Sequence, residues 1–114
     1  MNNPDSIKFE DFTKVKLCVG TVIAAEQNSK ANKPAYVLDI DFGDLGIKKS
    51  SAQITEHYTA STLIGQQIVA VMNFEPKRVA GIKSEVLVLA CVSEKEGTIL
   101  LQPTHGVSNG TRVL

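Results

Sequence analysis

The chain has 114 residues, of which 43% are hydrophobic and 21% charged, a balance that is ordinary for a globular domain and excludes a wholly disordered chain. A domain of this length buries roughly 65% of the surface that its unfolded chain exposes, so it can build a core without disulfides or metal. The formal net charge is zero. No overall field therefore draws the protein onto nucleic acid or an anionic membrane, and charge-driven binding requires a local patch.

The N-terminal sequence MNNPDSIKFEDF has neither the basic start nor the apolar run of a signal peptide or membrane anchor. No run of 18 apolar residues occurs anywhere in the chain, so we expect no membrane insertion. The two cysteines, Cys18 and Cys91, lie in apolar, strand-like sequence, and we expect reduced core residues rather than a disulfide. These features predict a cytoplasmic protein.

A short helix and a strand are the first predicted elements. Phe9 and Phe12 lie one helical turn apart, with acidic residues between them where a helix N-terminus favours negative charge. We expect this helix to plug one end of a barrel. Alternation from Val15 to Ile23 predicts the first strand, in which Gly20 marks a bulge or a sharp bend.

Two more strands and a second helix follow in the predicted order. Residues 36–42 alternate apolar with mostly polar side chains, and after a turn the more polar residues 47–54 form the next strand. Thr59 is placed to cap a short helix that runs through Leu63 and ends at Gly65.

The second half of the chain contains strongly apolar segments. Residues 68–74 alternate up to Pro76, which has no N–H to donate to a ladder and ends that strand. Residues 86–92 and 99–101 are apolar on both faces, although an isolated small barrel leaves one face exposed to water. We therefore expect a partner chain or another element to cover the second face.

Five strands with a short helix between the third and the fourth are the order expected of an OB-fold. We therefore predict an all-β protein: a five-stranded OB-fold Greek-key barrel with short N-terminal and inter-strand helices and a C-terminal extension. The expected parts of this single domain, residues 1–114, are an N-terminal helix segment (1–14), the barrel (15–92) and a C-terminal dimerisation arm (93–114). OB-folds bind oligonucleotides, oligosaccharides and peptides, so the fold alone does not identify the ligand.

Several motifs resemble one family in order and spacing. KLCVGTVIAAE, KANKPAYVLDIDFG, IKKSSAQITEHY, LIGQQIVAVMNF, PKRVAGIKSEVLVL and the final LLQPTHGVSNGTRV are similar to the CsaA-type export chaperones, a branch of the tRNA-binding OB-fold domains. This resemblance covers nearly the whole chain. It implies a cytoplasmic homodimer that assists protein export by binding unfolded precursor polypeptides, and a surface that binds the outer corner of tRNA.

In the resembled dimers the C-terminal segment pairs or packs across a two-fold axis, and the apolar end of this chain fits such an arm. The N-terminal phenylalanines join that interface or, as an equally good account, pack within their own barrel. The residues expected at the dimer interface are Phe9, Phe12, Ile99, Leu100, Leu101 and Pro103.

A tRNA-binding surface would use the basic connection between the last apolar strands. Lysine and arginine contact phosphates without reading the bases, and recognition of folded RNA by shape needs little more. Matching positions in the resembled domains add polar contacts. The residues expected to bind nucleic acid are Lys30, Lys33, Asn73, Lys77, Arg78, Lys83 and Ser84. The plain alternatives are a solvated loop and side chains that satisfy only nearby backbone groups.

A polypeptide-binding surface needs an accessible apolar hollow with polar margins. Met72 and Phe74, at the end of a strand and close in sequence to the basic connection, are the expected walls, although such residues are often simply core. Two departures from the wider tRNA-binding pattern favour polypeptide as the principal ligand. Cys18 stands where relatives carry an arginine, and Val86 stands where the synthetase-linked domains have glycine.

Catalysis finds little support in the sequence. There is no glycine-rich phosphate loop, and the histidines, His57 and His105, are expected at the surface. Asp39 and Asp41 share a strand face, which a solvent-exposed face explains as well as an acid pair does. We therefore expect a binding protein with no catalytic residues, no metal and no cofactor.

Overall fold

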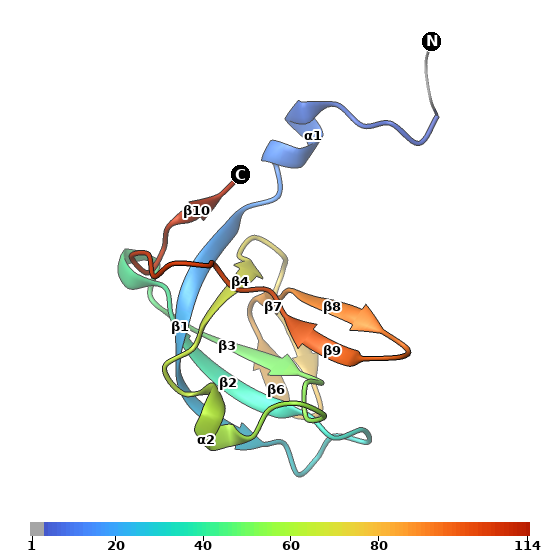
Figure 1. The fold of residues 1–114 in the computed structure, drawn as a ribbon, viewed down its shortest axis with the longest axis vertical. Helices are drawn as coiled ribbons and strands as arrows, with labels where there is room; N and C mark the ends of the chain where they lie inside the picture. Colours follow the sequence, from blue (N-terminus) through green and yellow to red (C-terminus); the bar gives the residue numbers. More distant parts are fainter. Residues whose placement is uncertain (1–3) are drawn as a thin grey trace.

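A computed structural model describes residues 4–114; residues 1–3 of the predicted N-terminal segment lie outside the described residues. A strongly curved antiparallel sheet of six strands forms the body of the protein, and five of them lie in the order β3-β2-β1-β4-β7 (Figure 1). These five are β1 (Leu17–Gln27), β2 (Tyr36–Asp41), β3 (Ile47–Ala52), β4 (Gln67–Val71) and β7 (Leu87–Val88). Helix α2 (Ala60–Leu63) separates β3 from β4. The predicted all-β OB-fold is therefore confirmed.

Alternation in β2 builds the barrel core as the sequence predicts. Leu38, Ile40 and Phe42 are fully buried inside the barrel, whereas Asp39 points outward and forms an ion pair with Lys49 on β3. A short 3-10 turn, η1 (Gly43–Leu45), then leads into β3. The sheet thus has one apolar inner face and an outer face that is partly polar.

Strand β1 is the longest strand and pairs with different partners along its length. Its first half pairs with β4 and its second half with β2. Near its start both faces are covered, because Leu17 and Val19 on the outer face form a second apolar cluster with Val69 and Val71 of β4. This outer cluster lies outside the barrel.

The prediction of a bulge at Gly20 is wrong. The register of β1 against β2 shifts between Val22 and Ala24 instead. Gly20 has a different role: a Cβ atom at this position would lie 2.6 Å from the ring of Phe42 and 2.7 Å from Ile40. Glycine is required here because the barrel core packs directly against the backbone.

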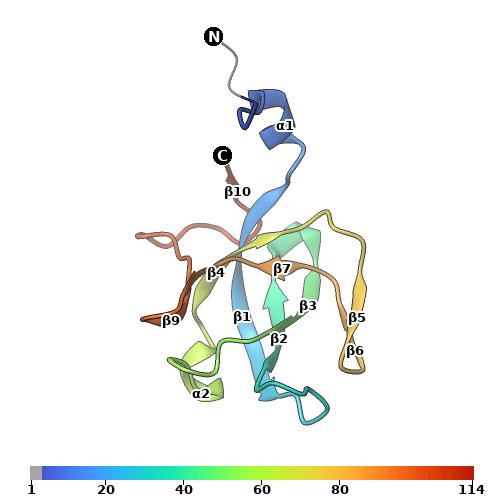
Figure 2. The same cartoon turned by 90° about the vertical axis from the view of Figure 1, so that its right-hand side faces the viewer.

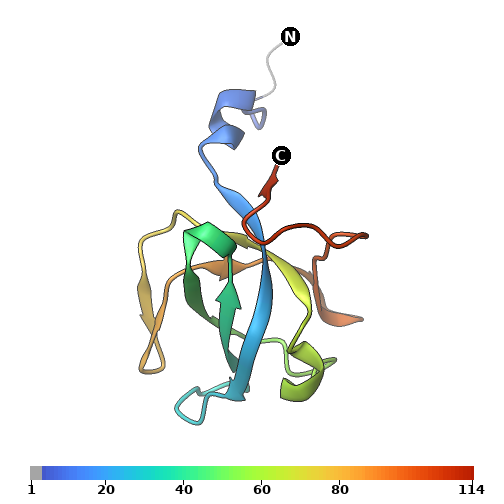
Figure 3. The same cartoon turned by 90° about the vertical axis from the view of Figure 1, so that its left-hand side faces the viewer.

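Helix α1 (Phe9–Thr13) forms as predicted but does not plug the barrel. It lies beyond the first residue of β1 and away from the barrel opening (Figure 1, Figure 2, Figure 3). The Phe9 side chain is 72% exposed, while Phe12 packs on the outer cluster. Its five residues are too few to bury a complete apolar face, so tertiary contacts determine where the helix lies.

The short helix α2 matches its predicted boundaries. The Thr59 hydroxyl accepts a hydrogen bond from the Thr62 amide and caps the helix, and Leu63 is fully buried in the core. Gly65 has a φ of 92°, the left-handed conformation in which the chain leaves the helix. Helix α2 thus lies beside β1.

The predicted strand over residues 86–92 is divided in the structure. It consists of β7 followed by β8 (Ala90–Ser93), and β8 pairs with β9 (Gly97–Leu100) in a separate hairpin. The division falls at Leu89, because there the neighbouring strand changes from β4 to β9. Before β7 a second hairpin forms from β5 (Lys77–Val79) and β6 (Ile82–Ser84), which stands beside the barrel in Figure 2.

The C-terminal segment returns to its own barrel. Strand β10 (Arg112–Val113) pairs with the start of β1 in the same chain, and the Arg112 guanidinium donates hydrogen bonds to the Thr13 and Val15 carbonyls. The end of the predicted arm therefore holds the N-terminal segment of the same chain.

The cysteines are both free thiols, but they differ in environment. Cys18 is buried in the core, as predicted, whereas Cys91 is exposed on the β8–β9 hairpin, so its assignment to the core is wrong. No helix within residues 4–114 is long and apolar enough to cross a membrane.

Candidate functional site

A hollow of about 450 Å³ opens between the β5–β6 hairpin and the barrel. We call it the hairpin pocket; its lining residues are Ser51, Phe74, Glu75, Lys77, Val79, Ser84, Glu85, Val86 and Leu87. Its volume is within the range of small-ligand and peptide sites. The hairpin pocket is therefore the first candidate for a binding site.

The walls of the hairpin pocket are mainly apolar and partly open to solvent. Phe74 is 56% exposed and Leu87 is 49% exposed, while Val86 is buried at the base. Phe74 follows the end of β4, so it is not enclosed by the barrel. Met72, the other predicted wall residue, packs against the core cluster and does not line the pocket.

The base of the hairpin pocket is fixed to the barrel. The Glu85 amide donates to the Lys49 carbonyl at 2.8 Å, and the Ser51 amide donates to the Ser84 hydroxyl at 3.2 Å. The Lys49 amide in turn donates to the Glu85 carboxylate at 3.2 Å. These contacts join the end of β6 to the otherwise unpaired edge of β3, so the pocket is preformed and its Ser84 hydroxyl is already engaged.

Asn73 also has a structural contact. Its side-chain NH₂ donates to the Lys14 carbonyl at 2.7 Å, and its side-chain oxygen accepts from the Lys16 amide at 2.9 Å. Both ends of the amide thus bind the segment between α1 and β1. We conclude that Asn73 positions this segment and that its amide is already engaged.

The basic residues of the β5–β6 hairpin lie on two faces. Arg78 is directly opposite Lys83 in the ladder, while Lys77 is opposite Ser84 and lines the hairpin pocket. Arg78 and Lys83 therefore share the outer face of the hairpin. Like charges directly opposite each other destabilise a strand pair, and a bound anion would relieve this repulsion.

The loop between β1 and β2 brings two further lysines to the region of the hairpin turn. The Asn28 side chain donates to the Ala80 carbonyl at the hairpin turn, at 3.4 Å. A Cβ atom on Gly81 would lie 3.1 Å from the Lys30 side chain. A hollow of about 380 Å³ between the two loops is lined by Lys30, Lys33, Val79 and Ala80, among others. We call Lys30, Lys33, Arg78 and Lys83 the basic face.

Acidic groups moderate the charge near the pocket. Glu75 and Glu85 line it together with Lys77, so its margin carries both signs. On β3, the Lys49 ammonium forms a 2.7 Å hydrogen bond with Asp39 that raises the pKa of Lys49 above its usual value. The hairpin pocket is thus apolar with a mixed-charge rim, whereas the basic face beside it is cationic.

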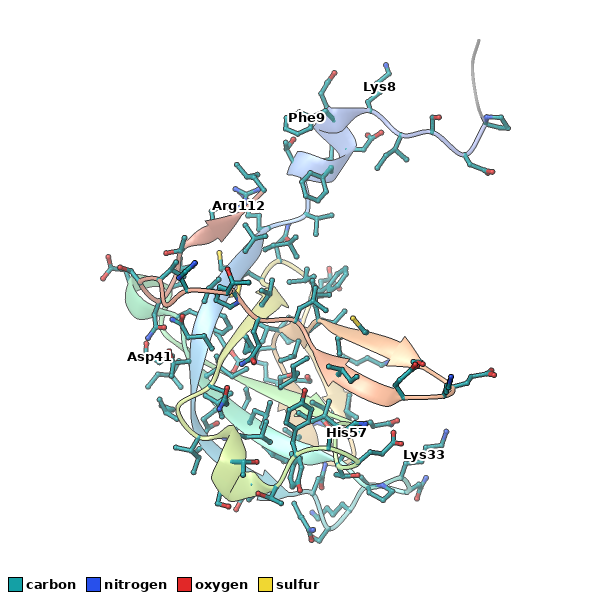
Figure 4. All side chains as sticks on the ribbon, viewed as in Figure 1. Lys8, Phe9, Lys33, Asp41, His57 and Arg112 are labelled. Carbon is teal, nitrogen blue, oxygen red and sulfur yellow. The ribbon has the colours of Figure 1, made fainter. Side chains whose placement is uncertain are left out.

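The residues considered for catalysis do not come together. Asp39 pairs with Lys49, and the Asp41 carboxylate accepts a hydrogen bond from the Gly43 amide. His57 is exposed and contacts the Glu96 carbonyl, at a different place on the molecule from Asp41 (Figure 4). Within the part of the chain that the structure describes, no group of acidic, histidine or cysteine side chains is arranged to hold a metal ion.

The residues predicted at a dimer interface occupy three environments. Phe9, Ile99 and Leu101 are exposed, Phe12 and Pro103 are partly buried, and Leu100 belongs to the barrel core. Figure 4 shows Phe9 on α1, far from Lys33. The exposed members are therefore free to meet another surface.

Six residues that line the hairpin pocket are not among the predicted site residues: Ser51, Glu75, Val79, Glu85, Val86 and Leu87. For Val86 and Leu87 the available signal was a short segment that is apolar on both faces. Sequence alone does not show that a hairpin leaves the barrel between β4 and β7 and encloses this space.

Comparison with known proteins identifies the family. The family described as "Putative tRNA binding domain" matches residues 17–112. The methionine–tRNA ligase of Methanococcoides burtonii is 34% identical over 107 residues, which are 94% of this chain but 16% of the ligase. The ligase of Pyrococcus abyssi is 35% identical over 107 residues, 94% of this chain and 14% of that protein. The chain thus spans only a small part of these enzymes.

Solved structures of CsaA chaperones match almost the whole chain. The chaperone CsaA of Bacillus anthracis has a TM-score of 0.91 and 56% identity, and the match covers 96% of this chain and 99% of that one. CsaA of Picrophilus torridus has a TM-score of 0.89 and 43% identity, covering 96% of this chain and 100% of that one. The chain therefore belongs to the tRNA-binding domain family and, within it, is of the CsaA type.

Proposed function

We propose that this chain is a non-enzymatic, CsaA-like chaperone that binds unfolded precursor polypeptides before their export. The observation that carries this proposal is the hairpin pocket, in which the half-exposed Phe74 and Leu87 stand on a preformed base. Unfolded polypeptides expose apolar side chains, which gain free energy when such a hollow removes them from water. The CsaA relatives, which are chaperones, support this assignment.

We further propose that the protein acts as a cytoplasmic homodimer. The exposed apolar side chains of Phe9, Ile99 and Leu101 support an interface with a second copy. Two hairpin pockets in one dimer would bind a single long polypeptide with greater avidity than either pocket alone. The measured mass in solution tests this assembly, and a monomer at micromolar concentration would contradict it.

Binding of the outer corner of tRNA is the second candidate function. The basic face supports it, because the Lys30 side chain lies against Gly81 of the hairpin turn, whose carbonyl accepts a hydrogen bond from Arg78, and Lys83 is directly opposite Arg78. The family match supports it as well. Phosphates of a folded RNA would contact these cations and Lys77 without any reading of base identity.

Salt dependence separates the two functions. If about five cations contact phosphates, tRNA affinity falls roughly 100- to 500-fold between 50 and 200 mM salt. Changing Lys77, Arg78 and Lys83 together to alanine would abolish that binding. Affinity for a denatured polypeptide would change little with salt, because the hairpin pocket is mainly apolar. A tRNA complex that is insensitive to salt would contradict the RNA proposal.

Suppression of aggregation tests the chaperone proposal. At stoichiometric amounts, the purified protein should slow the aggregation of denatured clients as measured by light scattering. An unrelated protein of similar size and charge is the control. Failure with several different clients would contradict the proposal.

A further inference from the structure

The strand formed by β7 and β8 has one edge without a partner. The Leu89 amide donates to the Val69 carbonyl on β4, and the Leu101 amide donates to the Leu89 carbonyl beyond β9. Alternate residues of a strand direct their backbone groups to opposite edges. The backbone groups of Val88, Ala90 and Val92 therefore point to the other edge.

This second edge is unpaired within residues 4–114. Strand β7 pairs only with β4, and β8 pairs only with β9. No hydrogen bond outside the strand ladders joins Val88, Ala90 or Val92 to a described residue. Within the ladders they are non-hydrogen-bonded pairs with β4 and β9, because Leu89 between them is a hydrogen-bonded position and the two kinds alternate. We call these three residues the free edge.

The free edge lies along a hollow of about 370 Å³. The end of β3 forms the opposite side, with Ser51 and Gln53. Ser51 and Leu87 line both this hollow and the hairpin pocket, so the two spaces are adjacent. They follow one another along the line between β3 and β7, and together we call them the groove.

The chemistry of the free edge is unusual for a soluble protein. Natural edge strands are protected by charged side chains, proline or a bulge, because an exposed edge pairs with other chains. Here Val88, Ala90 and Val92 supply none of these, and Val92 is 86% exposed. The edge is thus available for pairing with another strand.

We propose that an extended segment of a polypeptide pairs with the free edge, while a neighbouring apolar side chain of the same segment enters the hairpin pocket. This inference rests on the proposed polypeptide-binding function and adds the way in which the polypeptide is held. Backbone pairing provides affinity without regard to sequence, and the pocket selects an apolar side chain. This division of roles between the free edge and the hairpin pocket suits a protein that binds many unfolded clients.

The character of the groove favours an extended polypeptide over other ligands. No charged side chain lines the hollow at the free edge, so it offers nothing to the phosphates of RNA. A helical segment has no backbone groups free to pair, since its own turns use them. Only an extended chain presents both unpaired backbone groups and alternate side chains.

N-methylated peptides test the pairing directly. The probe is a fluorescein-labelled peptide in which leucine alternates with serine, with a lysine at each end, and binding is measured by anisotropy. N-methyl groups on one set of alternate residues should weaken binding roughly tenfold or more, because they block the pairing hydrogen bonds. N-methyl groups on the other set should have a much smaller effect. Equal affinities for all the peptides would overturn the proposal.

A substitution in the protein provides the complementary test. Val92→Pro removes only an N–H that has no partner in the fold, and proline is tolerated at strand edges. It should weaken binding of the same peptide several-fold, whereas Val92→Thr, which keeps the N–H and a similar shape, should not. A Val92→Pro variant with unchanged affinity would contradict the proposal.

Hydrogen exchange locates the bound segment. Binding of the peptide should slow amide exchange at Val88, Ala90 and Val92, whose N–H groups have no partner in the free protein. Peptide binding with unchanged exchange there would overturn strand pairing but leave the proposed function standing. If no peptide binds at all, both the strand pairing and the proposed polypeptide-binding function are contradicted. Protection that appears without peptide and grows with protein concentration would show that a second copy occupies the edge, which also overturns the proposal.

Discussion

Replacement of Phe74 and Leu87 by serine tests the hairpin pocket without disturbing the barrel. Both side chains line the pocket and are about half exposed, at 56% and 49%. Because neither is enclosed by the core, the double variant Phe74→Ser/Leu87→Ser should remain folded. Its loss of function would therefore report on the site.

The expected loss follows from the exposed fractions. Complete burial of a leucine or phenylalanine side chain is worth roughly 1.5–3 kcal/mol, and about half of that burial is already achieved in the free protein. Each side chain can therefore contribute about 1 kcal/mol when a polypeptide covers it. Removal of both should weaken binding by about 2 kcal/mol, or roughly 30-fold.

The assay is the affinity for a reduced, denatured client measured at high salt, where the basic residues contribute least. Leu45 and Ile47 are matched controls, since they are 49% and 59% exposed and do not line the hairpin pocket. The double variant Leu45→Ser/Ile47→Ser should bind the client normally. Equal affinities for the two double variants would refute the assignment of the pocket.

Three further substitutions test how the fold supports the site. Gly20→Ala should lower the free energy of unfolding by at least about 1–3 kcal/mol, because the added Cβ would lie 2.6 Å from the Phe42 ring. Ala80→Gly should raise it by about 1 kcal/mol, because Ala80 has a φ of 48° in the hairpin turn, which costs a non-glycine residue energy. Asn73→Ala should lower it by about 2 kcal/mol, because the hydrogen bonds to the Lys14 carbonyl and from the Lys16 amide are lost. Urea unfolding measures all three.

Matched variants make these stability predictions specific. Gly106→Ala should be neutral, because nothing lies within 4 Å of the added Cβ, and Asn32→Ala changes an exposed loop amide. A Gly20→Ala variant as stable as Gly106→Ala would contradict the close packing of the core. Likewise, an Asn73→Ala variant as stable as Asn32→Ala would show that this amide does not hold the N-terminal segment, and a destabilised Ala80→Gly variant would show that the turn is unstrained.

Local sequence signals predicted the barrel well, because they depend on neighbouring residues. Alternation in residues 36–42 identified the buried face of β2, and the Thr59 hydroxyl caps α2 as its position predicts. The hypothesis of tRNA binding grouped Lys30 with the β5–β6 hairpin, and the structure places the Lys30 side chain against Gly81 in the turn of that hairpin.

Features that depend on distant contacts were not predictable in the same way. The apolar pattern around Cys91 indicated a strand but not that β8 leaves the barrel to pair with β9, so the thiol is exposed. Helix α1 has the expected sequence, yet contacts from Arg112 and Asn73, far along the chain, hold the segment that follows it. Leu87 lines the pocket only because the hairpin before it is hydrogen-bonded to the end of β3, which is a contact between distant residues.

Amide chemical shifts map where a polypeptide binds and so test the hairpin pocket as its site. Titration with an unfolded, apolar client peptide should shift the amides of Phe74, Val86 and Leu87, and the shifts should persist at high salt. Shifts confined to Lys30, Arg78 and Lys83 that disappear as salt rises would contradict polypeptide binding in the hairpin pocket.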